Sequence, residues 1–180
     1  GNVVNPDEII ESYGADSLRL FYMFLGPLEK AKPWSASGVQ GSHRFVRRIW
    51  NLLINEEGEL YNTIDDSKPD ETLTRLLNQT IRKVTEDLDS LRFNTAISQL
   101  MIFVNTLKER TSLPKTVVET LVLLLSPLTP HICEELWEKM GHSSSLAYEI
   151  WPSYSEELAK EELITIAVQI NGKKRAEIEV

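Results

Sequence analysis

The sequence has 180 residues, a length that fits one domain, or one domain with part of another. Apolar residues make up 42% and charged residues 26%, which excludes an intrinsically disordered chain. The net charge of −8, from 19 Lys and Arg against 27 Asp and Glu, excludes a uniformly basic nucleic-acid binder. Any contact with nucleic acid therefore requires a local basic patch.

The single cysteine, Cys133, excludes an internal disulfide and favours a reducing compartment. No apolar run is long enough to cross a membrane, and no signal peptide precedes the first helix. These features predict a soluble cytoplasmic protein without a membrane partner. Because Gly1 opens directly on a helix signal and the sequence stops at Val180 in the middle of an alternating pattern, we expect it to be a piece of a longer chain.

Two short helices are predicted first. Asn5 can cap a helix that has Pro6 at its first position and ends at Gly14. Asp16 is predicted to cap a second helix, which Gly26-Pro27 ends. Residues 28–38 hold Pro33 and two serines and are typical of a loop.

A long helix is predicted from about Val39 to Asn55. At about 100° per residue, its apolar residues fall on one face and its arginines on the other. The apolar face includes Phe45 and Ile49, and the polar face includes Arg44, Arg47, Arg48, Asn51 and Asn55. Residues 56–71 are acidic and are expected to form an exposed connection.

Four further helices follow from apolar spacings of three and four residues. They cover Leu73–Leu91, Asn94–Leu107 with Asn94 as cap, Pro114–Leu125, and Thr129–Gly141. Because the connections are short, the fold class predicted is mainly α, an antiparallel helix bundle.

The period changes to two near the end of the sequence. Residues 164–170 and 176–180 alternate, and Asn171-Gly172 between them is a strong hairpin signal. We therefore predict a short C-terminal β-hairpin that belongs to a further domain. The predicted organisation is a connecting segment over 1–38, the bundle over 39–152, and a linker with the hairpin over 153–180.

Catalytic and metal-binding patterns are weak. His131, Cys133 and Glu134 lie close together, but the paired histidines of a zinc helix are missing. Cys133 is expected to be a packed core residue, and no glycine-rich phosphate loop occurs. We predict no catalytic residue, no metal and no cofactor site in these 180 residues.

The most informative charged feature is the cluster of Arg44, Arg47 and Arg48, because the chain as a whole is acidic. Guanidinium groups match phosphate oxygens, so the cluster is a candidate RNA contact, against the alternative of a solvated helix face. Lys173, Lys174 and Arg175, just after the hairpin turn, form a second, weaker basic spot, in which Lys173 and Lys174 are further candidate RNA contacts. Of the tryptophans, Trp50 and Trp137 are expected in the core, and Trp34 is open to base stacking.

Several stretches together resemble one family. Gly1–Asp7 (GNVVNPD) is similar to the segment that follows the signature lysine loop of class I aminoacyl-tRNA synthetases. The stretches that resemble bacterial-type leucyl-tRNA synthetase are Tyr13–Phe21 (YGADSLRLF), Gly26-Pro27, Trp34-Ser35, Gly38–Trp50 (GVQGSHRFVRRIW), Ser126–Trp137 (SPLTPHICEELW) and Val168–Lys173 (VQINGK).

The resemblance implies part of the ligase that attaches leucine to its tRNA with ATP and Mg. It places ATP chemistry in parts of the enzyme before Gly1, so the segment itself is expected to be catalytically inactive. Arg44 and Arg48 match arginines on the tRNA-facing helix of the family, with Arg47 as a third contact or a structural ion-pair partner. The implied partners are leucine-accepting tRNA and the rest of the synthetase chain, with no DNA.

Two alternatives stay open. The first is a segment of a valyl-, isoleucyl- or methionyl-tRNA synthetase, against which the Gly38–Trp50 stretch and the Asn171-Gly172 hairpin argue. The second is a helical protein-interaction module without an RNA role, which the net charge of −8 favours. A steep fall of tRNA binding with added salt separates RNA binding from the second alternative.

Overall fold

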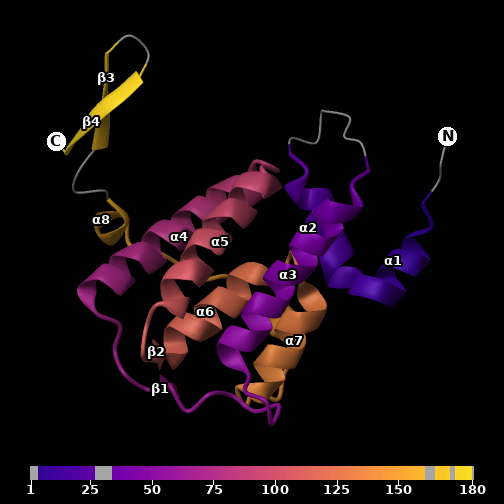
Figure 1. Ribbon diagram of the computed structural model, residues 1–180. Helices are drawn as coiled ribbons and strands as arrows, with labels where there is room; N and C mark the ends of the chain where they lie inside the picture. Colours follow the sequence, from indigo (N-terminus) through magenta and orange to yellow (C-terminus); the bar gives the residue numbers. More distant parts are fainter. Residues whose placement is uncertain (1–3, 27–33, 161–164, 171–172, 180) are drawn as a thin grey trace.

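The computed structural model describes residues 4–26, 34–160, 165–170 and 173–179, with side chains up to residue 160. Helices dominate it (Figure 1). The elements in chain order are α1 (Pro6–Tyr13), α2 (Ala15–Phe24), α3 (Ala36–Leu53), β1 (Ile64–Asp65), α4 (Glu71–Asp89), α5 (Phe93–Lys108), β2 (Leu113–Pro114), α6 (Lys115–Leu125), α7 (Pro130–Lys139), the 3₁₀ turn η1 (Leu146–Tyr148), α8 (Glu156–Ala159), β3 (Thr165–Ile170) and β4 (Lys173–Glu179). The mainly α fold class is confirmed.

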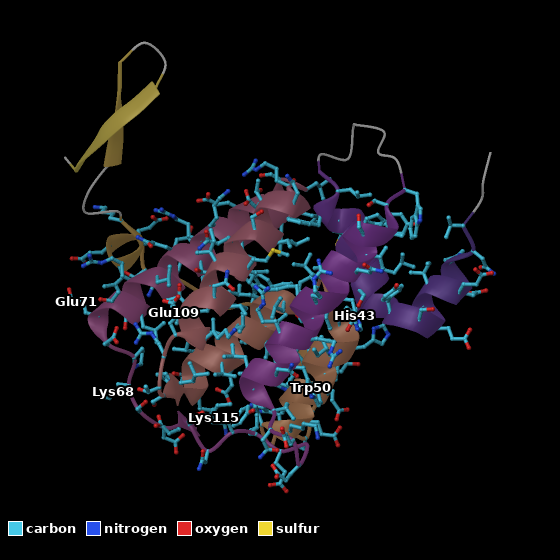
Figure 2. All side chains as sticks on the ribbon, viewed as in Figure 1. His43, Trp50, Lys68, Glu71, Glu109 and Lys115 are labelled. Carbon is cyan, nitrogen blue, oxygen red and sulfur yellow. The ribbon has the colours of Figure 1, made fainter. Side chains whose placement is uncertain are left out.

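The core lies where α3, α5, α6 and α7 meet. Phe103 and Leu100 of α5 and Leu121 of α6 are fully buried there, and side chains fill the space between the helices (Figure 2). After a three-residue turn, α5 runs back along α4 (Figure 1). Neighbouring helices joined by short turns form the antiparallel bundle that the sequence predicts.

The expected core residues on α7 are buried. Cys133 is fully buried, and Trp137 is buried with its ring stacked on that of His142, the centroids 3.6 Å apart. Trp50 is half-buried against the core, with Lys139 Nζ 5.8 Å from its ring centre. Trp34 is exposed, and its ring meets that of Phe21 edge-on at 5.2 Å.

Two predicted helix caps are wrong. α2 begins at Ala15, so Asp16 lies in its first turn and its side chain does not cap this helix. Its buried carboxylate accepts hydrogen bonds from the backbone of His131 and Ile132, and so caps α7 instead. Asn94 lies inside α5, which begins one residue earlier at Phe93. The predicted cap at Asn5 is confirmed, since Asn5 Oδ1 accepts from Asp7 N at 3.1 Å.

The segment between α3 and α4 is exposed, as predicted, but it is more than a connection. Ile54 and Leu60 form an antiparallel bridge, and β1 pairs in parallel with β2, Ile64 beside Leu113. The sequence prediction missed these backbone contacts because β2 lies almost fifty residues further along the chain. They hold residues 60–65 against the end of the bundle.

β3 and β4 pair antiparallel, with Ile166 beside Ile178 and Val168 beside Ala176, so the predicted hairpin strands are confirmed. The predicted turn at Asn171-Gly172 lies outside the described residues. The division of the chain at residues 38 and 152 stays a prediction. Over the described residues, no helix is both long and apolar enough to cross a membrane.

Candidate nucleic-acid interface

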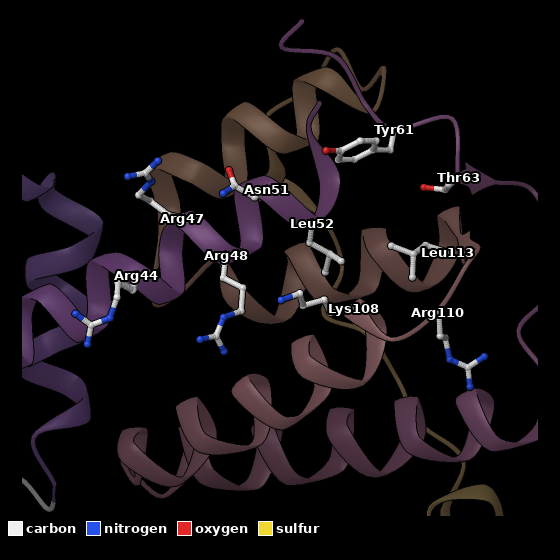
Figure 3. Close-up of a pocket in the computed structure, with 10 residues that line it drawn as sticks. All are labelled: Arg44, Arg47, Arg48, Asn51, Leu52, Tyr61, Thr63, Lys108, Arg110 and Leu113. Carbon is white, nitrogen blue, oxygen red and sulfur yellow. The ribbon is translucent and has the colours of Figure 1, made fainter. Parts of the chain in front are cut away.

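α3 presents its arginines on the side away from the core. Phe45 and Ile49 are buried, whereas Arg44, Arg47 and Arg48 are all exposed. Arg44 and Arg48 are one turn apart, and both leave the helix on the same side (Figure 3). The amphipathic spacing predicted from the sequence thus sets which side chains of α3 are available to a ligand.

The arginines line a groove of about 640 Å³ between α3, the segment after it and the end of α5 (Figure 3). Five of its ten lining residues are cationic, and none is acidic. The ten are Arg44, Arg47, Arg48, Asn51, Leu52, Tyr61, Thr63, Lys108, Arg110 and Leu113. A chain of net charge −8 therefore carries a local concentration of positive charge at this groove.

Lys108 and Arg110 join the groove from the carboxyl end of α5, and the sequence analysis missed both. By itself the run Lys108-Glu109-Arg110 is an ordinary charged helix end. α5 approaches α3 closely enough for Arg48 Nη1 to donate to Asn105 Oδ1 at 2.8 Å. This packing, which sequence spacing does not reveal, adds two cations to the arginine face.

The five cations differ in how they are compensated. Arg110 forms a two-pronged ion pair with Asp70, at 2.5 and 3.3 Å. This pairing, together with a hydrogen bond from Leu73 N, holds the pKa of the Asp70 carboxyl below its usual value. Arg48 is oriented by a hydrogen bond to Asn105, a neutral side chain that does not compensate its charge.

Arg44, Arg47 and Lys108 have no hydrogen bond or ion pair to any residue in the described part of the chain. The alternative of Arg47 as an ion-pair partner therefore has no support among these residues. Uncompensated guanidinium and ammonium groups that share one groove suit a ligand with several phosphates. The contact of these residues with RNA stays a prediction.

The second basic spot lies in a part of the chain where only the backbone is described. Lys173 and Lys174 lie in β4, and their side chains are outside the described residues. Their predicted RNA contact also stays a prediction.

The residues around Cys133 are engaged in holding the bundle. Burial raises the pKa of the Cys133 thiol to about 12, so the thiol stays protonated and is a poor nucleophile. His131 Nδ1 lies 2.8 Å from the carboxylate of Asp16. Within the ranges that the structure describes, no three His, Cys, Asp or Glu residues form a group able to hold a metal ion.

Comparison with known proteins agrees with this fold. Residues 70–180, more than half of the chain, match the family described as the anticodon-binding domain of tRNA ligase. The chain belongs to this family. The family match includes Lys108 and Arg110 of the groove, and the α3 arginines lie before it.

A solved structure extends the likeness of this anticodon-binding domain to the whole chain. It is the agnB2 leucyl-tRNA synthetase of Agrobacterium radiobacter K84, in a ternary complex with tRNA and LeuAMS. The two chains are 31% identical with a TM-score of 0.78, and the match covers 100% of this chain and 25% of that one. The resemblance to leucyl-tRNA synthetase is thus confirmed, and the chain spans a quarter of the length of that synthetase.

Proposed function

We propose that this chain is the tRNA-binding helical part of a leucyl-tRNA synthetase, the ligase that attaches leucine to its tRNA with ATP. The observation that carries the proposal is the groove with five cations and no carboxylate in an acidic protein. The likeness to a leucyl-tRNA synthetase crystallised with tRNA supports it. Its partners would be leucine-accepting tRNA and the rest of the synthetase, in the cytoplasm where translation takes place.

The groove would hold the sugar–phosphate backbone of the tRNA. Arg44 and Arg48, about 6 Å apart along the helix axis, offer donors to successive parts of one strand, and Lys108 approaches from the facing wall. Contacts of this kind position RNA without reading its sequence. Arg48 is held in place by Asn105 and so loses less side-chain freedom on binding.

We propose that leucine activation with ATP and Mg takes place elsewhere in the synthetase. Within this chain the thiol of Cys133 is buried and protonated, and His131 is paired with Asp16. An ATP–pyrophosphate exchange assay of the chain alone with leucine should give only background. Exchange above background would place part of the activation site here.

The experiment that tests tRNA binding compares Arg44→Ala and Arg48→Ala in the complete synthetase. Each variant should weaken tRNA binding and charging about ten- to a hundredfold, the scale of a charge-assisted hydrogen bond. Leucine activation, which requires no tRNA, should be nearly unchanged, as should the melting temperature. Lys160→Ala removes the same charge from an exposed site outside the groove and serves as the control.

Two outcomes would contradict the proposal. If activation and charging fall equally, the arginines support the fold or the ATP site. If neither falls, the arginines are a solvated helix face, and the protein-interaction alternative gains support. Charging of a valine, isoleucine or methionine tRNA in place of a leucine tRNA would favour the other synthetases.

A further inference from the structure

The groove changes in character toward the carboxyl end of α3. Leu52 and Leu113 line this part, and Tyr61, from the segment that follows α3, lines it as well (Figure 3). Both leucines are anchored in the bundle, since Leu113 is buried and Leu52 packs against the main core. Tyr61 itself remains 37% exposed. One groove therefore joins a cationic wall to an apolar and aromatic one.

The backbone that carries Tyr61 is held on both sides. Tyr61 N donates to Leu53 O at 2.9 Å, and Tyr61 O accepts from Ile64 N at 3.0 Å. Leu113 N donates to Thr63 O at 2.8 Å, which ties the same segment to β2. The phenol hydroxyl has no hydrogen bond to a residue within the described ranges. An aromatic ring on a fixed backbone loses little freedom when a ligand stacks on it.

The two walls match the two halves of a nucleotide. Guanidinium and ammonium groups bind its phosphate, and an aromatic ring stacks on its base. A paired base inside an RNA helix is covered on both faces by its neighbours, so only an unpaired nucleotide can offer a face to Tyr61.

We propose that the groove takes an unpaired nucleotide of the bound tRNA. Its phosphate lies against Arg48 and Lys108, and its base stacks on Tyr61 above Leu52 and Leu113. This proposal rests on the proposed function, because it assumes that the groove binds tRNA. The stacking contact forms only where the fold of the RNA leaves a base unpaired. The contacts from the cations require only phosphate charge.

Binding of a leucine tRNA transcript to the complete synthetase tests the proposal. Tyr61→Ala should weaken binding about 5- to 150-fold, the range for loss of one stacked base. Because the phosphate contacts remain, the dependence of the binding constant on salt between about 50 and 200 mM should be unchanged. Arg48→Ala should lower that dependence by about one ion. Tyr61→Phe should bind like the parent, and Tyr148→Ala, at an 87% exposed tyrosine outside the groove, is the matched control.

Three results would overturn the stacking contact. They are parent-like binding by Tyr61→Ala, a loss in Tyr61→Phe equal to that in Tyr61→Ala, or a reduced salt dependence in Tyr61→Ala. If Arg48→Ala still weakens binding in these cases, the proposed function stands and only the stacking is wrong. If neither variant weakens binding, the proposed function itself fails.

If Tyr61→Ala is destabilised, Tyr61→Leu replaces it, because leucine keeps an apolar side chain at the groove but has no flat ring. Weak binding by Tyr61→Leu at the parent's melting temperature supports the proposal. Binding by Tyr61→Leu as tight as the parent's overturns it.

Discussion

Two groups of cations in this bundle look alike in the sequence and differ in the carboxylates that face them. Near the end of α4, Nζ of Lys83 on that helix and Nε of Arg92 in the following turn lie 2.6 and 2.9 Å from the fully buried carboxylate of Asp87. On α3, Arg44, Arg47 and Arg48 face a groove whose lining includes no carboxylate. Both groups are partly or fully open to water.

The difference shows how the surroundings of a cation separate a structural role from a binding role. Lys83 and Arg92 compensate a charge that the fold has buried, so their removal would leave the Asp87 carboxylate without a cation beside it. The α3 arginines form no ion pair with a carboxylate in the described part of the chain. Their charge is available to a ligand, and the fold has little need of it.

The largest effect expected from this comparison is on stability. Lys83→Ala together with Arg92→Ala should cost about 3 kcal/mol of unfolding free energy, the low end for a broken buried pair because both cations are half-exposed. Arg44→Ala together with Arg48→Ala removes the same charge and should cost less than about 0.5 kcal/mol. Urea unfolding of the two double variants measures the contrast. Equal losses would show that the α3 arginines also support the fold.

The second effect is the response of stability to acid. Burial acts to raise the pKa of Asp87, but hydrogen bonds from Lys83, Thr95 and Arg92 outweigh it and the pKa lies below its usual value. The stability that this carboxylate contributes is present above the pKa of the unfolded chain, about 4, and is lost as the pH falls through the lower pKa of the folded state.

The unfolding free energy of Asp87→Asn should therefore depend less on pH than that of the parent below about pH 4. The slope should be smaller by up to about 1.4 kcal/mol per pH unit, the value for one proton. Urea unfolding from neutral pH to about pH 3 measures it. Asp89→Asn, an exposed site on the same helix, is the control and should keep the pH dependence of the parent. If Asp87→Asn also keeps it, the charge pair does not contribute to acid sensitivity.

The smallest effect concerns Arg110. This residue lines the groove, as the α3 arginines do, and is also paired with a carboxylate, that of Asp70. Asp70→Asn removes the carboxylate that compensates the charge of Arg110. It should tighten tRNA binding by up to about fivefold, the scale of an exposed ion pair. Asparagine is as good a helix cap as aspartate, so α4 should keep its beginning. Asp89→Asn changes the net charge equally outside the groove and should leave binding unchanged. Weaker binding by Asp70→Asn would show that the ion pair is needed to position Arg110.

Short-range patterns in the sequence determined the helices and the direction of the α3 arginines. Apolar spacing of three and four residues places Phe45 and Ile49 in the core, and the same period directs Arg44 and Arg48 outward. Alternation predicts β3 and β4 in the same way. These predictions succeed because each depends on neighbours within a few residues, where the geometry of a helix or strand is known in advance.

The tertiary structure alone decided what the arginines share the groove with. Lys108 and Arg110 reach it because α5 packs beside α3, and Tyr61 reaches it because β1 pairs with β2. Asp16 caps a helix that begins more than a hundred residues later, in place of its own. No local period carries such information, because these contacts form only when the apolar faces of distant helices close on one core.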